Sequence, residues 1–173
     1  MFSRILILFS IIFLPLMIFG LPKFTIKSNS FENNGDIPSK YSYHNSNISP
    51  ELHWSNFPQK TKSFAIIVDD PDAPVKTWVH WVIYNIPKTT TSLKEHLTHE
   101  KIFPSGITQG KSDFKNFGYD GPAPPYGTHH YHFKIYALDA ELNLPPGLTK
   151  SQLEEKIKHH ILAKSEIIGL FAK

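Results

Sequence analysis

Residues Ser63–Asp69 read SFAIIVD, and this unbroken run of aromatic and β-branched residues decides the fold class. A run of this length, bounded by polar residues, predicts a strand that is buried on both faces. Two further runs of strand-forming residues are Trp78–Ile86 (WVHWVIYNI) and His129–Leu138 (HHYHFKIYAL). Weaker alternation predicts strands at Phe24–Ser28 and Leu52–Trp54. We therefore expect a mainly β domain built from antiparallel strands.

One helix is predicted near the C-terminal end. Thr149 and Ser151 are candidate N-caps, because Gln152 and Glu154 follow them at the spacing of a capping box. The apolar positions that then mark one helical face are Leu153, Ile157, Ile161 and Leu162. With this helix the fold class becomes α+β, with β structure dominant.

The composition is typical of one globular domain and excludes several classes of protein. The chain has 173 residues, of which 40% are hydrophobic, and this is enough for one substantial core. Its 18 basic and 15 acidic residues give a net charge of only +3 without a long basic block, which disfavours nucleic acid as a partner. The absence of cysteine excludes disulfides, thiolate zinc sites and cysteine nucleophiles.

The first twenty residues resemble a secretory signal peptide. Arg4 precedes the apolar run Ile5–Phe19, which Pro15 interrupts and small Gly20 follows. We therefore assign residues 1–20 to a signal peptide and residues 21–173 to a single domain that is exported to the periplasm or secreted. An uncleaved N-terminal membrane anchor is the alternative. N-terminal mass spectrometry of the mature protein distinguishes the two.

Two polar clusters flank the junction between the first two strong runs. Asp69-Asp70-Pro71-Asp72-Ala73-Pro74 follows a buried strand, and its two prolines restrict the backbone around the carboxylates. An ordinary Asp/Pro turn is the alternative. In Trp78-Val79-His80-Trp81, strand alternation predicts Trp78 and His80 on one face and Val79 and Trp81 on the other. A histidine that is simply satisfied within the core is the alternative there.

A third polar cluster, His129-His130-Tyr131-His132, begins the last strong run. Alternation predicts His129 and Tyr131 on one face and His130 and His132 on the other. His130-x-His132 has the form of a strand-borne zinc pair, but the spacing supplies no third ligand, and a plain solvated strand is the alternative. We therefore expect neither a metal nor a cofactor.

Taken together and in order, these clusters resemble the phosphatidylethanolamine-binding protein family, in particular its bacterial and archaeal Raf kinase inhibitor-like branch. The likeness extends over residues 24–173. The matching elements are Asn47-x-Ser49-Pro50-x-Leu52-x-Trp54, Asp70-Pro71-Asp72-Ala73-Pro74, Trp78-x-His80-Trp81-x-x-Tyr84-Asn85-Ile86-Pro87, Gly121-Pro122-Ala123-Pro124-Pro125-x-Gly127, His129-x-Tyr131-x-Phe133, and Leu148-Thr149 with His160-Ile161-Leu162-Ala163. Asn47-Ile48-Ser49 also fits a glycosylation sequon, but because it coincides with a family element we interpret it as structural.

The resemblance implies a large antiparallel sheet packed against a smaller one, with a C-terminal helix near the mouth of a small anion pocket. It also implies a non-enzymatic protein that binds phosphorylated groups or phospholipid head groups, with homodimers in some bacterial members. The residues that the resemblance places at the pocket are Asp70, Ala73, Pro74, Trp78, His80, Gly121, Pro122, Pro124, Pro125, His129 and Tyr131.

The residue chemistry agrees with such a pocket, because imidazole N–H, tyrosine O–H and glycine backbone N–H groups can all donate to an anion. A carboxylate that accepts from an imidazole N–H fixes the tautomer and favours the protonated ring, so that the other nitrogen can donate. We expect Asp70, His80 and His129 to form the polar floor, with Tyr131 completing it.

Two alternative functions follow from the same residues. An exported inhibitor or interaction module would act on a protein partner such as a hydrolase. A His/Asp hydrolase is less favoured, because no G-x-S-x-G elbow is present and Ser105 and Ser112 lie in unpatterned loops.

Overall fold

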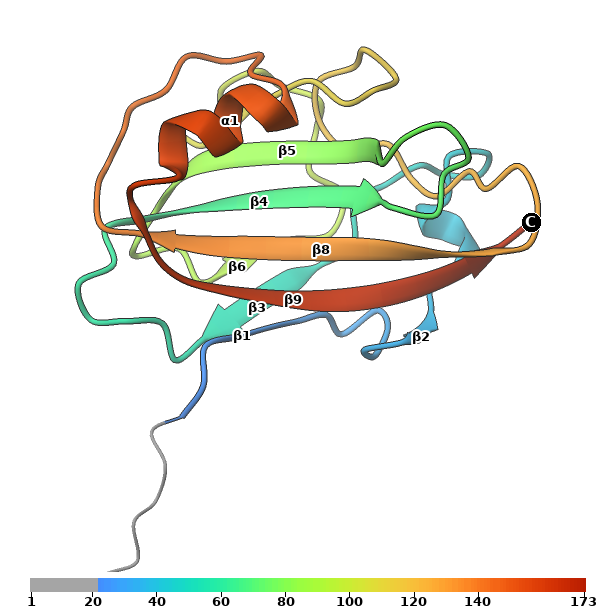
Figure 1. Ribbon diagram of the computed structural model, residues 1–173, viewed down its shortest axis with the longest axis horizontal. Helices are drawn as coiled ribbons and strands as arrows, with labels where there is room; N and C mark the ends of the chain where they lie inside the picture. Colours follow the sequence, from blue (N-terminus) through green and yellow to red (C-terminus); the bar gives the residue numbers. More distant parts are fainter. Residues whose placement is uncertain (1–21) are drawn as a thin grey trace, which may run out of the picture.

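The structure is a computed structural model that describes residues 22–173, so the predicted signal peptide lies outside the described residues. Figure 1 shows a large sheet, a smaller sheet behind it and the helix α1. In chain order the elements are β1 (Thr25–Lys27), β2 (Gly35–Asp36), the 3-10 turn η1 (Ser39–Tyr41), β3 (Leu52–Ser55), β4 (Ser63–Asp70), β5 (Trp78–Pro87), β6 (Ser92–Leu93), β7 (Thr108–Gln109), β8 (Thr128–Leu138), α1 (Lys150–Ile157) and β9 (Ile161–Ala172).

The large sheet has the strand order β2-β9-β8-β4-β5-β7 and the small sheet the order β1-β3-β6. All pairings are antiparallel except the short one between β2 and β9. The three strong apolar runs form β4, β5 and β8, which are neighbours in the large sheet. The predicted mainly β α+β fold, with two packed sheets and a helix near the C-terminal end, is confirmed.

Every residue of β4 is buried, because the strand is covered on both faces. Its inner face contributes Phe64 and Ile66 to a core that includes Trp54 of the small sheet. Its outer face contributes Ala65 and Ile67 to a second core, which the helix covers with the side chains of Leu153 and Ile157. Burying an aliphatic side chain of this size contributes about 1.5–3 kcal/mol, so the two cores hold β4 as a fixed frame.

The helix is shorter than predicted. The capping box at Thr149 and Gln152 is present, but α1 ends at Ile157. Ile161 and Leu162, which were expected on its apolar face, begin β9 instead and are more than one-third exposed. Pairing along the whole length of β8 satisfies the backbone of β9, and this long-range interaction outweighs the local helical spacing. No helix within residues 22–173 is both long and apolar enough to span a membrane.

A bulge in β5 changes the predicted orientation of the residues around His80. Val68 of β4 pairs with Trp81 and Asp69 pairs with Val79, so that β5 has one extra residue at this point. Trp81 therefore enters the inner core, whereas Val79 enters the outer core. The prediction that Val79 and Trp81 share a face is wrong. The bulge lets His80 reach the inner face beside Trp81.

Candidate functional site

Three strand ends bring the predicted polar residues together. Because β4 is antiparallel to both β5 and β8, its end lies beside the starts of these neighbours. Asp70 is the last residue of β4. Trp78 and His80 lie at the start of β5, and His129 and Tyr131 at the start of β8. The fold thus assembles one site from segments that are far apart in the sequence.

Asp70 and His129 form a buried pair at this site. The Nδ1 atom of His129 lies 2.7 Å from Oδ2 of Asp70, and the two side chains are only 4% and 5% exposed. The carboxylate can only accept, so Nδ1 carries the hydrogen and Nε2 is left for another partner. The second oxygen, Oδ1, accepts from the backbone N–H of Asp72 at 2.9 Å. The expected carboxylate–imidazole interaction is therefore present, with His129 as the imidazole.

His80 is held differently, by a backbone carbonyl. Its Nδ1 lies 2.7 Å from the carbonyl oxygen of Asp120, and the residue is only 2% exposed. Burial lowers the pKa of His80 below its ordinary value of 6.5, although the Asp120 carbonyl and the charge of Asp70 act in the opposite direction. The ring meets the Tyr131 ring edge-on, with centroids 5.1 Å apart. His80 and Tyr131 therefore lie in direct contact on the inner face.

Two hydrogen-bond donors in this site have no partner. The hydroxyl of Tyr131 and Nε1 of Trp78 are both buried, and neither donates a hydrogen bond to any of the residues described. Burial, followed by the charge of Asp70, raises the pKa of Tyr131, so the phenol remains protonated and able to donate. Buried donors are normally satisfied, because leaving one unpaired costs about 1–3 kcal/mol. Both donors are therefore available to an acceptor that the chain itself does not supply.

Phe114 forms an aromatic wall beside these groups. Its ring centroid lies 5.5 Å from the ring centroids of both Trp78 and His80. The Phe114 ring also stacks on the Tyr43 ring, with centroids 4.5 Å apart. On the other side, Tyr126 meets the His129 ring edge-on at 6.2 Å. Aromatic rings therefore form these walls, and the buried carboxylates nearby are those of Asp70 and Asp120.

Gly121 brings the proline-rich segment close to the rest of the molecule. A Cβ atom at this position would lie 1.9 Å from the carbonyl oxygen of Tyr41, so only glycine fits. Its N–H donates to Oδ1 of Asn47 at 2.7 Å. This bond gives the Asn47 motif a structural role, in agreement with our interpretation of the sequon.

The other predicted pocket residues lie in the two loops that flank the site. Pro122 and Pro124 are buried, and Ala73 is half-buried, whereas Pro74 and Pro125 are exposed. Their positions in these loops are compatible with the walls that the resemblance implies. They make none of the side-chain polar contacts described above.

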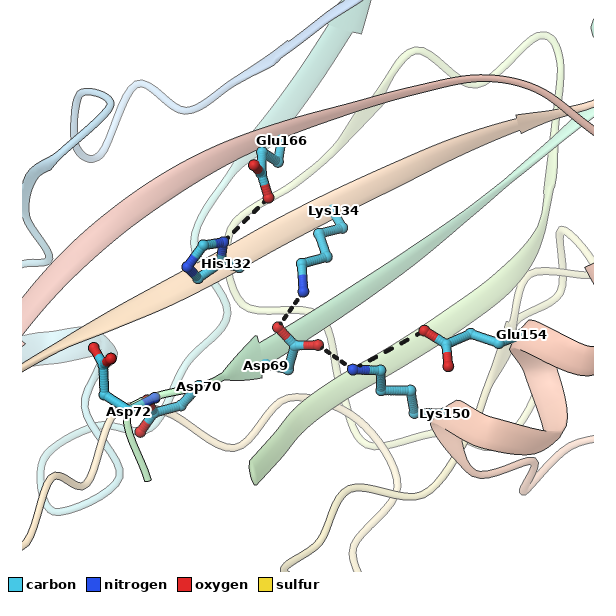
Figure 2. A network of polar contacts seen from close by, with 8 residues as sticks. All are labelled: Asp69, Asp70, Asp72, His132, Lys134, Lys150, Glu154 and Glu166. Carbon is cyan, nitrogen blue, oxygen red and sulfur yellow. Dashed lines mark hydrogen bonds and ion pairs between the residues drawn. The ribbon is translucent and has the colours of Figure 1, made fainter. Parts of the chain in front are cut away.

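The predicted alternation along β8 is correct, and the residues on its outer face form separate pairs. Nδ1 of His130 lies 2.6 Å from Asp72, and Nδ1 of His132 lies 3.1 Å from Glu166; Figure 2 draws the second of these contacts. Within residues 22–173 no group of three or more histidines and carboxylates is arranged to hold a metal.

The outer face at the end of β4 belongs to Asp69. This fully buried carboxylate accepts from Nζ of Lys134 at 2.6 Å and from Nζ of Lys150 at 2.5 Å (Figure 2). Lys150 also approaches Glu154 at 4.0 Å. Both oxygens of Asp69 are occupied by ion pairs, which connect β8 and α1 to β4.

The most spacious hollows described here lie away from the inner-face site. Two hollows of about 460 Å³ lie beside β9. The first is lined by Lys23, Lys134, Tyr136, Lys164, Ser165 and Glu166. The second is lined by residues from 23–33 and 165–167. Neither contains an unpartnered buried donor of the inner face. We therefore choose the inner-face site on chemistry and not on size.

Two contributors were missed by the sequence reasoning. Asp120 adjoins the Gly121-Pro122 element, but its contact with His80 spans 40 residues and leaves no spacing signal. Phe114 lies in a segment without strand or helix pattern, and only the folded chain places it against Trp78.

Known proteins share this architecture. A family model described as phosphatidylethanolamine-binding protein matches residues 27–172. The chain is 45% identical over 148 residues to a UPF0098 protein of Methanothermobacter thermautotrophicus, covering 86% of this chain and 98% of that one. It is 36% identical to the UPF0098 protein YbhB of Escherichia coli, covering 84% and 98%. The crystal structure of Escherichia coli YbcL, described as a new member of the mammalian PEBP family, superposes with a TM-score of 0.81 at 32% identity, covering 88% and 99%. The match to the family model and these identities establish that the chain belongs to the phosphatidylethanolamine-binding protein family.

Proposed function

We propose that this protein is a non-enzymatic binding protein whose inner-face site takes a small anionic ligand, either a phosphoryl group or a phospholipid head group. Family membership supports a binding role in general. The finer assignment to phosphoryl groups rests on the chemistry of the site. We also propose that the protein acts outside the cytoplasm, on the basis of the signal-like residues 1–20.

The observation that carries the proposal is the pair of unpartnered buried donors, the Tyr131 hydroxyl and Trp78 Nε1. An oxyanion offers several acceptor lone pairs within a small volume and could satisfy both donors at once. Nε2 of His129, on the same face of β8 as Tyr131, is left for a further partner, since Nδ1 is used by Asp70. The set of donors therefore fits a tetrahedral anion better than a cation.

Asp70 does not contradict an anion site. Its two oxygens already accept from His129 Nδ1 and the Asp72 backbone N–H. Each oxygen thus accepts one of the two bonds that it can accept, and the negative charge stabilises positive charge on the imidazole that the carboxylate orients. Asp70 therefore supports the donor without occupying the ligand's place.

The test is calorimetric titration of the full chain with inorganic phosphate, comparing Tyr131→Phe with Tyr136→Phe. Both tyrosines lie on β8, but Tyr136 packs against the outer core, away from the site. Removing the Tyr131 hydroxyl deletes a hydrogen bond to a charged ligand, so affinity should fall by about tenfold or more. Tyr136→Phe should leave affinity within about twofold. Absence of phosphate binding by the unaltered chain, or equal affinity in all three proteins, would overturn the assignment.

A hydrolase is the weaker candidate. Ser112 donates its hydroxyl hydrogen to the carboxylate of Asp120 at 2.6 Å, and it is Asp120 that contacts His80. Among residues 22–173 no serine or threonine hydroxyl bonds to His80 or His129, so the nucleophile–base contact that hydrolysis of this type requires is missing. An interaction module that acts on a protein partner would use an exposed surface, and binding of phosphate at the inner face neither requires nor excludes it.

A further inference from the structure

The two histidines of the site are oriented by different partners, and the difference determines what each can offer a ligand. Nδ1 of His129 donates to a carboxylate, that of Asp70. Nδ1 of His80 donates to a neutral carbonyl, that of Asp120, at 2.7 Å. A carbonyl oxygen can only accept, so the hydrogen of a neutral His80 ring lies on Nδ1, and Nε2 carries a lone pair. None of the side-chain hydrogen bonds found within residues 22–173 uses this Nε2, although the Gly121 carbonyl also lies near the ring.

The carbonyl that orients His80 is itself firmly held. The backbone N–H of Asp120 donates to the carbonyl of His80 at 2.9 Å. The buried carboxylate of Asp120 accepts from Ser112 Oγ at 2.6 Å and from Asn116 Nδ2 at 3.0 Å. Moving the hydrogen from Nδ1 to Nε2 would place the Nδ1 lone pair against the Asp120 carbonyl, so the tautomer is determined by the fold.

The surroundings also keep the ring neutral near physiological pH. The groups that face it are Asp70 from β4, Tyr131 from β8, and Asp120 and the Gly121 carbonyl from the proline-rich segment. Burial lowers the pKa of His80 and outweighs the two carbonyls and the charges of Asp70 and Asp120, all of which favour the protonated ring. The protonated tyrosine adds no charge. His80 therefore offers the ligand an acceptor, whereas Tyr131 and Trp78 offer donors.

We infer that the site selects oxyanions that still carry a hydrogen, such as hydrogen phosphate or a phosphomonoester monoanion, because His80 Nε2 accepts a hydrogen bond from the ligand's own O–H. This inference rests on the proposed function and narrows its ligand class to phosphoryl groups that keep an O–H, because a phospholipid head group linked as a phosphodiester has none. Tyr131 O–H and Trp78 Nε1–H would donate to the unprotonated oxygens of the same group. Sulfate and phosphodiesters carry no such hydrogen, so one of their oxygens would face the Nε2 lone pair.

Hydrogen phosphate and sulfate provide the direct test, since both are tetrahedral and carry nearly the same charge at neutral pH but only the first has an O–H. Calorimetry of the full chain should give sulfate an affinity about tenfold or more below that of phosphate, because an unmade buried hydrogen bond costs this much. Methyl phosphate should bind similarly more tightly than dimethyl phosphate at mildly acidic pH. Equal affinities within each pair would overturn the inference while leaving the proposed anion site intact. Failure of every anion to bind would overturn both.

A pair of variants assigns the selectivity to His80. His80→Phe removes the acceptor, so the preference for phosphate over sulfate should fall to about onefold. His129→Gln, the matched control on β8, should weaken both anions and preserve the preference. Retention of the preference in His80→Phe would contradict the assignment.

Should His80→Phe fail to fold, nitrogen-15 NMR of the unaltered chain reads the tautomer directly. We expect a protonated Nδ1 and an unprotonated Nε2 for His80 at neutral pH. A hydrogen on Nε2 in the phosphate-free protein would overturn the inference.

Discussion

Asp69 and Asp70 are consecutive residues of one strand, both buried, and yet they have opposite tasks because the strand turns them to opposite faces. Asp69 meets two lysines on the outer face, and both of its oxygens are used in ion pairs. Asp70 meets a histidine on the inner face. Figure 2 shows the lysine pair beside Asp69 and separates it from Asp70 and Asp72 at the strand end.

The side chain that pairs with each aspartate determines whether the aspartate stabilises the fold or supports ligand binding. A lysine paired with a carboxylate keeps its positive charge and can attract a second acid, as Lys150 does with Glu154 at 4.0 Å. A histidine paired through Nδ1 retains a second ring nitrogen on the opposite edge. Asp70 therefore orients the His129 ring so that its second nitrogen remains for a ligand. The ion pairs of Asp69 hold β8 and α1 against β4 instead.

The largest expected effect comes from leaving Asp69 without cations. The double variant Lys134→Met, Lys150→Met leaves a fully buried carboxylate unpaired and should lower the free energy of unfolding by about 3–5 kcal/mol. Urea denaturation monitored by circular dichroism measures it. Adding Asp69→Leu to the double variant should recover most of the loss, since no charge is then buried. A double variant as stable as the parent would mean that the lysines do not hold Asp69.

The second prediction separates the two aspartates by ligand affinity. Asp70→Asn removes the negative charge beside His129 and forces one amide to serve both the imidazole and the Asp72 N–H, so phosphate affinity should fall by about tenfold. Asp69→Asn lies on the other face and should leave affinity within about twofold for the folded protein. Calorimetry with inorganic phosphate tests both. Equal losses in the two variants would show that the faces are not independent.

Much of this architecture could be predicted from the sequence, where local pattern and folded structure agree. The runs that became β4, β5 and β8 are buried on at least one face along their length, so strand propensity and packing point the same way. Alternation placed His129 and Tyr131 correctly on the inner face, and the capping box located the start of α1. These features depend on residues that are close in the sequence.

The features that escaped prediction depend on distant partners. Ile161 and Leu162 continue the helical spacing of Leu153 and Ile157, and only pairing with β8 makes them a strand. The bulge beside His80 is a mismatch between two strands and is invisible in either one alone. The tautomer of His80 likewise depends on a carbonyl that is 40 residues away.

The third prediction concerns pH and the inner-face histidine. Because burial lowers the pKa of His80 in the folded protein, the unfolded ring gains its proton first as the pH falls through its ordinary value of 6.5. Stability should therefore be fully present above this value and should decline as the pH falls toward the lower folded pKa. Thermal unfolding between about pH 8 and pH 5 measures the decline. In His80→Phe its slope should be smaller than in the parent, and an unchanged slope would assign it to other groups.

The smallest effect is expected at Asp72, the third aspartate of the cluster. Unlike Asp69 and Asp70, it is exposed. Its hydrogen bond with His130, which is half-exposed, lowers the pKa of Asp72. A folded-state pKa below the ordinary 3.8 means that this contribution is present above that value and is lost as the pH falls below it. Water screens the pair, so Asp72→Asn should cost less than about 1 kcal/mol at neutral pH, measured by urea denaturation.

Phosphate affinity of Asp72→Asn should stay close to that of the parent, because Asp70 keeps its bond from the residue-72 backbone N–H in the variant. A tenfold loss of phosphate affinity in Asp72→Asn would instead show that binding requires the loop with Ala73 and Pro74 to be held against β8. Asp72 would then be needed for binding, as Asp70 is.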